Sequence, residues 1–376
     1  MEYSRLQDKC RGSLVGGAIG DALGYEVEFM DLCSIRRRFG ESGITRYVLH
    51  EGVARFSDDT QMTLFTLEGL MNGVIATKAG KIEEILPYIE KAYLNWYRTQ
   101  LESPGKLADS WIGNIKSLWT RRAPGMTCLQ ALENIKMGIA VENCSKGCGG
   151  VMRVAPIGIF NAVHRHIYDY SDTARIAGGA AEITHKHMAS TFSSALLATI
   201  VMNCISDESV DSMQFYFIIT GGLIMMKEYY PGHDKEWSKF DSLIRRALDF
   251  GKSDCPEEEA ILELGQGWIA EEAIAIAIFC VMRHIDNFEK CIVSAVNHDG
   301  DSDSTGAIAG NIIGAILGYA AIPAYFKDNL EIEPILVSVA DDLCADVKIR
   351  EVNLRIGERY IEHIPAEVNA EYLIKS

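Results

Sequence analysis

Two stretches of the chain carry a glycine at every fourth position, and this spacing constrains the fold more than any other feature. The glycines are Gly12, Gly16, Gly20 and Gly24 in the first stretch and Gly306, Gly310, Gly314 and Gly318 in the second. Residues four apart share one face of an α-helix, so each stretch would present a strip without side chains. Each glycine costs up to about 1 kcal/mol relative to alanine inside a helix. We therefore expect two central helices, and close approach of their backbones to other elements would offset that cost.

The rest of the sequence favours an all-α fold. Helical periodicity is widespread, as in KIEEILPYIEKAYLNWY and AEEAIAIAIFCVMRHI, whereas alternating β-branched runs between turn dipeptides are sparse. The segments ESPGK, RRAPG and NCSKGCGG are candidate loops. Because no low-complexity linker or repeat divides the chain, we expect one compact domain over residues 1–376. Its core motifs would span about 12–325, with helical cover and a variable tail over 327–376.

Composition excludes some classes of function. The formal net charge of −16 argues against a general nucleic-acid or membrane-surface binder, which would need a basic face. Ten cysteines without dense pairing resemble reduced thiols, and the lone pair Cys144 and Cys148 is weak evidence for zinc. The N-terminus is too charged for a signal peptide, so we expect a cytoplasmic protein.

An uncharged run over residues 304–326 is long enough to span a bilayer. Acidic residues crowd its start, and Pro323 interrupts it before a full span. A buried central helix is the better interpretation, and we expect no membrane partner.

Two acidic segments far apart in the sequence each precede a helical run. They contribute Ser57, Asp58 and Asp59 from FSDDT, and Asp301, Asp303 and Ser304 from GDSDST. Such residues are often only helix caps placed favourably in the helix dipole. Together, however, they would supply four carboxylates and two hydroxyls, the all-oxygen shell that Mg²⁺, Mn²⁺ or Ca²⁺ prefers. Two ions roughly 3.5–4 Å apart could share these ligands, so the sequence predicts a split metal site.

Rival motifs fit the second segment less well. An EF-hand would need glycine and glutamate where the chain has Ser304 and Gly310. The phosphatase pattern DxDx[TV] is met by Asp301, Asp303 and Thr305, but it should follow an apolar strand. Asp299 is a neighbour of the site without an assigned role.

A third segment, NCSKGCGGVMRVAPIG, combines three glycines with Ser145, Lys146 and Arg153. Backbone N–H groups in such a loop can form a concavity that binds an anion, although a plain loop is the commoner outcome. Beside a metal site, this loop indicates a substrate with phosphate groups and a hydroxyl-rich sugar.

Four segments in order resemble the ADP-ribosylglycohydrolase family, of the dinitrogenase-reductase-activating type: GAIGDALGYEVEF, FSDDTQM, GCGGVMRVAPIG and GDSDSTGAIAG. The segments ITHKHMAS and GQGWIAEEAIAIAIF resemble two further motifs of that family. The resemblance spans Gly17 to about Gly314. It implies an all-α fold with two Mg²⁺ or Mn²⁺ ions and hydrolysis of the bond between ADP-ribose and a protein side chain, with arginine as the first linkage to test.

The resemblance also assigns residues. It places the metals on Ser57, Asp58, Asp59, Asp301, Asp303 and Ser304, and a gating glutamate at Glu28. Asp59 or Asp303 would relay a proton from a water that the metals orient and acidify. The substrate would contact Ser145, Lys146, Gly147, Cys148, Gly149, Gly150, Met152, Arg153 and His185. Cys148 stands where the family commonly has asparagine, which removes an amide donor.

Two alternatives stay open at this point. The chain could be a metal-containing ADP-ribose binder without activity, or a phosphatase that uses Asp301 as nucleophile. The sequence leaves open the target protein, the linkage, the choice between Mg²⁺ and Mn²⁺ and the oligomeric state.

Overall fold

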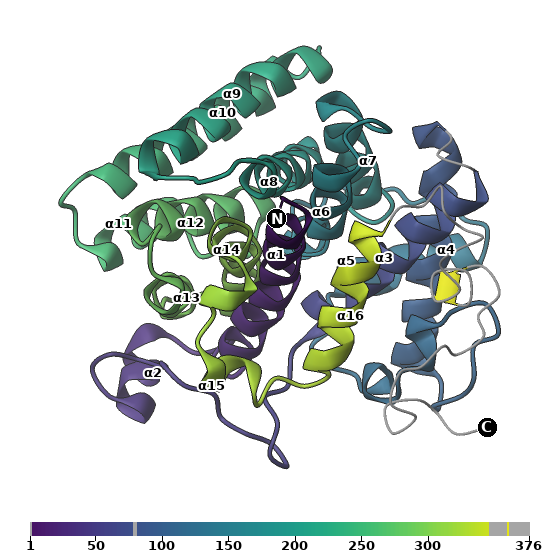
Figure 1. Cartoon of the computed structure of the whole chain (residues 1–376), viewed down its shortest axis with the longest axis horizontal. Helices are drawn as coiled ribbons and strands as arrows, with labels where there is room; N and C mark the ends of the chain where they lie inside the picture. Colours follow the sequence, from purple (N-terminus) through teal and green to yellow (C-terminus); the bar gives the residue numbers. More distant parts are fainter. Residues whose placement is uncertain (1, 78–80, 346–358, 361–376) are drawn as a thin grey trace.

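The structure is a computed structural model that describes residues 2–77, 81–345 and 359–360. Within these ranges the chain forms sixteen α-helices joined by loops and four short 3₁₀ turns, and no sheet is present (Figure 1). The all-α prediction is therefore confirmed.

The helices are α1 (Glu2–Gly24), α2 (Leu32–Phe39), α3 (Asp58–Ala76), α4 (Ile82–Leu101), α5 (Met126–Lys136), α6 (Ala155–Val163), α7 (Tyr170–Glu182), α8 (Met188–Ser206), α9 (Ser212–Tyr229), α10 (Asp234–Lys252), α11 (Glu257–Leu264), α12 (Ala270–Arg283), α13 (Phe288–Val296), α14 (Ser302–Leu317), α15 (Ala324–Lys327) and α16 (Glu333–Cys344). The 3₁₀ turns are η1 (Ile112–Asn114), η2 (Lys116–Trp119), η3 (Cys148–Gly150) and η4 (Tyr319–Ala321).

The two glycine strips pack against each other at the centre of the molecule. Helices α1 and α14 run antiparallel, so that Gly16 faces Gly310 and Gly20 faces Gly306. A Cβ atom added to Gly20 would lie 1.9 Å from the carbonyl oxygen of Gly306. No side chain fits between these backbones, which confirms the prediction that both helices are central and closely packed.

The uncharged run over 304–326 does not form one long helix. It divides into α14, η4 and the start of α15, and nearly all of α14 is buried. The predicted buried central helix is thus confirmed. In the described part of the chain, only α8 is long and apolar enough to pass a test for membrane spans, and 89% of its most apolar stretch is buried inside the protein. That burial is typical of a core helix.

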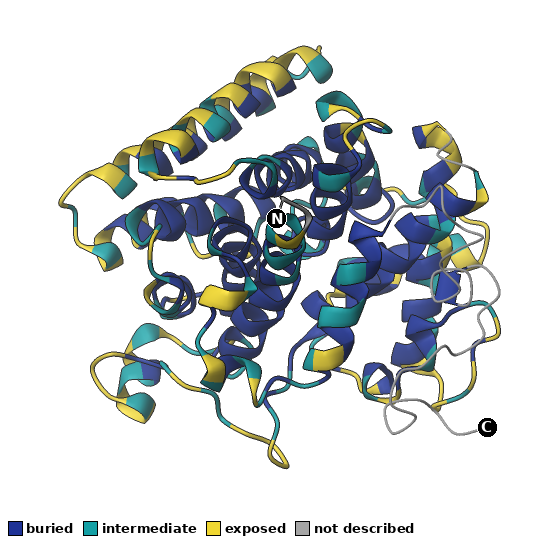
Figure 2. Ribbon diagram, in the orientation of Figure 1, coloured by how far each residue is buried: buried dark blue, intermediate teal, exposed yellow. Residues whose placement is uncertain are grey.

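Burial decreases from the centre outward (Figure 2). The paired α1 and α14 are buried on nearly every side, whereas α9 and α10 form an outer layer with one exposed face. Helix α16 packs on α1 and α6 and forms part of the helical cover predicted for residues 327–376. The rest of the predicted tail, residues 346–358 and 361–376, lies outside the described residues.

Candidate active site

The first acidic segment forms the start of α3, and a buried carboxylate of α1 fixes its position. Asp58 is the first residue of α3 and Ser57 is its N-cap, whose Oγ accepts a hydrogen bond from the Asp59 N–H at 3.2 Å. The fully buried Asp21 accepts from the backbone N–H of Ser57 at 2.8 Å and of Thr60 at 2.9 Å. Asp21 therefore ties the start of α3 to α1. The sequence analysis did not assign Asp21, although a lone charge in the otherwise uncharged second half of α1, residues 12–24, is a signal for such a role.

The second acidic segment forms the start of α14. Asp301 is the N-cap, and the Ser304 N–H donates to Asp301 Oδ1 at 3.3 Å and to Asp303 Oδ1 at 2.8 Å. The N–H of Asp301 donates to the carbonyl oxygen of Gln266 at 2.8 Å, which anchors the preceding turn. Both acidic segments thus lie at loop-to-helix junctions, as predicted from the sequence.

The two helix starts meet at one cavity of about 160 Å³. Of the predicted metal ligands and catalytic residues, those that line it are Glu28, Asp58, Asp59, Asp301, Asp303 and Ser304. Ser57 is buried behind the cavity as the cap of α3 and does not line it. Five carboxylates therefore share a space the size of one sugar ring.

Burial of so many carboxylates makes their charged forms unfavourable. Burial, chiefly, raises the pKa of Asp58 to about 8, although the Gly125 N–H that donates to it acts in the opposite direction. Burial, with the charges of Asp301 and Asp58 next, raises the pKa of Glu28 to about 9. For the same reasons the pKa of Asp59 and that of Asp303 lie well above the ordinary value for aspartate. A cation in the cavity would remove this cost.

The donor chemistry of the cavity fits hard divalent cations, but the side chains are not gathered around an ion. Asp59 Oδ2 and Glu28 Oε2 are buried and have no hydrogen-bond partner among the described residues. Buried polar atoms normally have partners, so these two oxygens are available to accept a hydrogen bond or to coordinate a cation. In the same part of the chain, no three His, Cys, Asp or Glu side chains converge into a ready ion site. An ion would therefore have to draw the carboxylates inward.

Part of the glycine-rich loop forms the opposite wall. Gly147, Cys148, Gly149 and Met152 line the cavity together with His185. The loop is held by the Cys148 N–H, which donates to the carbonyl oxygen of Trp268 at 3.3 Å. The Cys148 thiol donates to Asp301 Oδ2 at 2.7 Å, so the residue that departs from the family pattern touches a predicted metal ligand directly.

The other predicted loop residues do not line the cavity. Arg153 is fully buried behind it, where its guanidinium donates to Thr184 Oγ1 at 2.7 Å and stacks on the Tyr93 ring at 4.1 Å. Lys146 pairs with Glu271 at 2.5 Å, and Ser145 Oγ lies 3.2 Å from Thr127 Oγ1. Gly150 is buried against Ser190 and Ala181. Arg153 and Gly150 are thus buried, whereas Lys146 and Ser145 are partly exposed.

His185 lies in the cavity as a neutral side chain. Burial, and next the charge of Arg153, lowers the pKa of His185 to about 3. Its Nδ1 is 2.9 Å from Thr184 Oγ1, the same hydroxyl that Arg153 contacts. His185 is therefore suited to hydrogen bonding with a substrate and not to carrying a charge near neutral pH.

Several lining residues were missed by the sequence analysis. The segment 123–128 contributes Ala123, Gly125, Met126, Thr127 and Cys128, and the 265–269 turn contributes Trp268. The exposed Phe29 stacks on Trp268, with ring centroids 5.9 Å apart, beside Glu28. The segment RRAPG was identified only as a loop, and its place at the site follows from long-range packing.

The polar neighbours of the second acidic segment have structural roles. Asp299 Oδ1 accepts a hydrogen bond from the Leu32 N–H at the start of α2. The ring of His298 lies 2.9 Å from Thr305 Oγ1 in the first turn of α14. Neither residue lines the acidic cavity.

The fold and the site define an all-helical enzyme class with an acidic, oxygen-rich cavity between two helix starts. The family model described as ADP-ribosylglycohydrolase matches residues 2–352. The chain therefore belongs to the ADP-ribosylglycohydrolase family, whose members are hydrolases of glycosyl bonds.

Individual relatives agree with this assignment. The ADP-ribosylarginine hydrolase Tri1 of Serratia proteamaculans is 27% identical over 351 residues, covering 90% of this chain and 80% of the relative. The ADP-ribosyl-(dinitrogen reductase) glycohydrolase of Rhodospirillum rubrum is 23% identical over 340 residues, covering 87% and 92%. A solved structure titled ADP-ribosylglycohydrolase-related protein complex matches with a TM-score of 0.60 at 21% identity, covering 91% of this chain and 98% of that one, and this likeness supports the fold.

Proposed function

We propose that this protein removes ADP-ribose from a modified arginine side chain of a protein, in a site completed by two divalent cations, Mg²⁺ or Mn²⁺. The observation that carries the proposal is the meeting of both acidic helix starts at one cavity, where two buried carboxylate oxygens have no partner in the described part of the chain. When bound, the cations would supply Lewis acidity toward a ribose hydroxyl and a water molecule.

The six oxygen-bearing residues predicted from the sequence remain the proposed ligands. Asp58, Asp59, Asp301, Asp303 and Ser304 face the cavity, whereas Ser57 would need to turn from its capping role to reach an ion. Glu28, which also lines the cavity, would contact the ions or the ribose. An all-oxygen set of this kind matches the preference of Mg²⁺ and Mn²⁺.

The chain's own residues would carry the proton and charge steps. Asp59 or Asp303 would accept the proton of the attacking water, because both carboxylates line the cavity and a carboxylate placed beside a water can act as a general base. The transition state for breaking a glycosidic bond carries positive charge on the sugar, and the surrounding carboxylates would stabilise it. Neutral His185 would donate or accept a hydrogen bond to the substrate.

The size of the cavity limits how much of the substrate can enter it. About 160 Å³ holds one sugar, so the terminal ribose would enter and the pyrophosphate would lie along Gly147 and Gly149 at the opposite wall. Glycine lets a phosphate approach the backbone there. The cationic guanidinium of a modified arginine is attracted to an acidic cavity, and the name of the Serratia relative specifies the same linkage.

The test is release of ADP-ribose from an arginine-modified protein in the presence of Mg²⁺ or Mn²⁺, followed by chromatography. Asp59→Asn and Asp303→Asn should each lower the rate by at least about 100-fold. Asp299→Asn, which removes a negative charge beside the first residue of α2 and outside the cavity lining, should keep the wild-type rate. Serine-linked and other conjugates run in parallel establish the linkage, and a wild-type protein that releases ADP-ribose from none of them would reject the proposal.

The second candidate is a metal-containing ADP-ribose binder without activity. Calorimetry that finds tight ADP-ribose binding together with zero turnover on every conjugate would support this alternative.

A further inference from the structure

We propose that the protein carries a second ligand site, for a small organic phosphate, in a pocket lined by Arg122. A ligand bound there would shift the segment that positions Asp58 in the acidic cavity. This proposal goes beyond the proposed function, since it concerns a different pocket. The pocket shares no lining residue with the acidic cavity.

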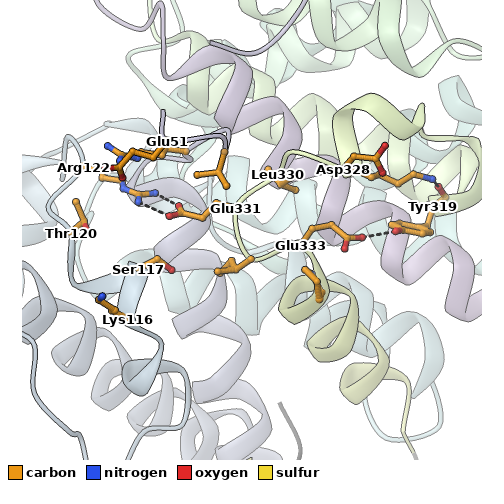
Figure 3. Close-up of a pocket in the computed structure, with 15 residues that line it drawn as sticks. Glu51, Lys116, Ser117, Thr120, Arg122, Tyr319, Asp328, Leu330, Glu331 and Glu333 are labelled. Carbon is orange, nitrogen blue, oxygen red and sulfur yellow. Dashed lines mark hydrogen bonds and ion pairs between the residues drawn. The ribbon is translucent and has the colours of Figure 1, made fainter. Parts of the chain in front are cut away.

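The Arg122 pocket is formed by residues of four segments: 51–55, 116–122, Tyr319 and 327–334 (Figure 3). Its volume is about 720 Å³, within the range of roughly 300–1,000 Å³ that is usual for small-molecule sites. It is several times larger than the acidic cavity, yet it contains none of the residues proposed for hydrolysis. The Arg122 pocket is therefore large enough to hold a ligand that is separate from the substrate in the acidic cavity.

The carboxylates that line the Arg122 pocket are mostly engaged already. Glu331 accepts two hydrogen bonds from the Arg122 guanidinium, at 2.5 and 3.0 Å, and Glu333 accepts one from the Tyr319 hydroxyl at 2.5 Å (Figure 3). Glu51 pairs with Arg55 at 2.8 Å. Asp328 is the remaining lining carboxylate, so two of the four, Glu51 and Glu331, are already balanced by an arginine.

Some hydrogen-bond donors of the pocket are not engaged by the described residues. Arg122 Nε and Ser117 Oγ are buried and have no partner among the described residues. Lys116 is exposed one residue before Ser117 and forms no ion pair within those same residues. Figure 3 shows Lys116, Ser117 and Thr120 on one side of the pocket, away from Glu333 and Tyr319. Unmet donors beside carboxylates of which two already pair with arginine favour an anion, and a phosphate group offers several acceptor oxygens at once.

The backbone beneath the pocket is held in a strained conformation. Ile332, which follows Glu331, has φ 51° and ψ 25°, the left-handed region that is unfavourable for a residue with a Cβ. The preceding residues pair with the segment leading to α3, since the Glu331 N–H donates to the Ala54 carbonyl oxygen at 3.1 Å. Strain of this kind is concentrated at sites that hold ligands.

Arg122 connects this pocket to the acidic cavity. Its carbonyl oxygen accepts a hydrogen bond from the Asp58 N–H at 3.1 Å, and its Nη1 donates to the Phe56 carbonyl oxygen at 3.0 Å. Three residues later, the Gly125 N–H contacts Asp58 Oδ2 at 3.3 Å. A phosphate that binds Arg122 Nε would compete with Glu331 for the guanidinium and shift the segment on which Asp58 depends.

The test measures binding of glycerol 3-phosphate to the metal-free full-length protein by calorimetry, with glycerol as the uncharged control. Lys116→Ala and Ser117→Ala should each weaken binding by about tenfold, as expected for the loss of a hydrogen bond to a charged group. Lys146→Ala, the matched lysine change beside the acidic cavity, should leave the affinity unchanged. Hydrogen exchange of the peptide over residues 56–62 should change when glycerol 3-phosphate binds.

Each outcome decides a part of the proposal. Absence of binding, or binding that Lys146→Ala weakens and Lys116→Ala does not, would overturn the second site. Binding at the Arg122 pocket without a change in exchange over 56–62 would overturn its action on Asp58. None of these measurements requires the protein to hydrolyse ADP-ribose, so failure of the proposed function would be recognised separately.

Discussion

Replacing Gly310 with alanine tests whether the contact between α1 and α14 controls stability. The new Cβ would lie 2.0 Å from the carbonyl oxygen of Gly16, 2.6 Å from its carbonyl carbon and 3.0 Å from the Cα of Gly17. All three atoms belong to the backbone of α1, so no side chain can rotate to relieve the clash. Ordinary contact distances are about 3.5–4.0 Å, and the two helices must therefore move apart by about 1 Å or more.

The expected loss of stability is the difference between two effects. Alanine favours the helix by up to about 1 kcal/mol over glycine, whereas forcing atoms into a packed core costs typically 1–3 kcal/mol, occasionally more. Because the clash here is with backbone, we place the cost at or above the upper end and expect Gly310→Ala to lower the free energy of unfolding by about 2 kcal/mol. Gly310→Leu, with three more carbon atoms to place, should unfold the protein or abolish metal binding.

A matched control lies in α9. Gly221 is also inside a helix, but a Cβ added there meets nothing within 4 Å. Gly221→Ala should therefore raise the free energy of unfolding by about 0.5–1 kcal/mol through helix propensity alone. Urea denaturation of both variants, followed by far-ultraviolet circular dichroism, measures the two changes against the wild type. If Gly310→Ala were as stable as Gly221→Ala, the close approach of the two glycine strips would not limit stability.

Three further predictions concern charge and metal. Asp303→Asn should raise the melting temperature of the metal-free protein, because it removes one of several buried, mutually repelling carboxylates. Thermal scans with and without MnCl₂ should show stabilisation by the ion in the wild type only. Cys148→Ala should tighten Mn²⁺ binding by about fivefold in calorimetry, since it removes a thiol that competes for Asp301 Oδ2; weaker binding would mean that the thiol helps to hold the ion. Burial raises the pKa of Glu68 to about 7, so the contribution of Glu68 to stability is fully present below about pH 4.5 and is lost as the pH rises through 7. Glu68→Gln should therefore flatten that part of the curve of unfolding free energy against pH. An unchanged curve would contradict the assignment.

Local patterns in the sequence predicted the helices and the acidic half of the site because their signals are local. Spacing by four defines a helix face without reference to any other element, and Ser57 or Asp301 before an apolar run is a cap signal in itself. The glycine-rich loop was harder to interpret. Gly147 and Gly149 face the cavity, but Arg153 finds its partners in Tyr93 and Thr184, which are remote in sequence. Which side of a loop faces a cavity depends on such partners.

The same limit explains why Asp21 and segment 123–128 were missed, and the role of Asp21 shows how the site is assembled. One face of α1 carries the glycines that admit the backbone of α14, and Gly24 at its end lies against Ser302 at the start of α14. Asp21 on the same helix binds the first residues of α3 through two backbone N–H groups. Helix α1 therefore contacts and positions both acidic segments, which are far apart in sequence. It follows that substitutions on the glycine face of α1 should change both the affinity for a divalent ion and the free energy of unfolding. Helix α10 does not contact α1 or α3 closely, so a core substitution there of equal cost should change only the free energy of unfolding.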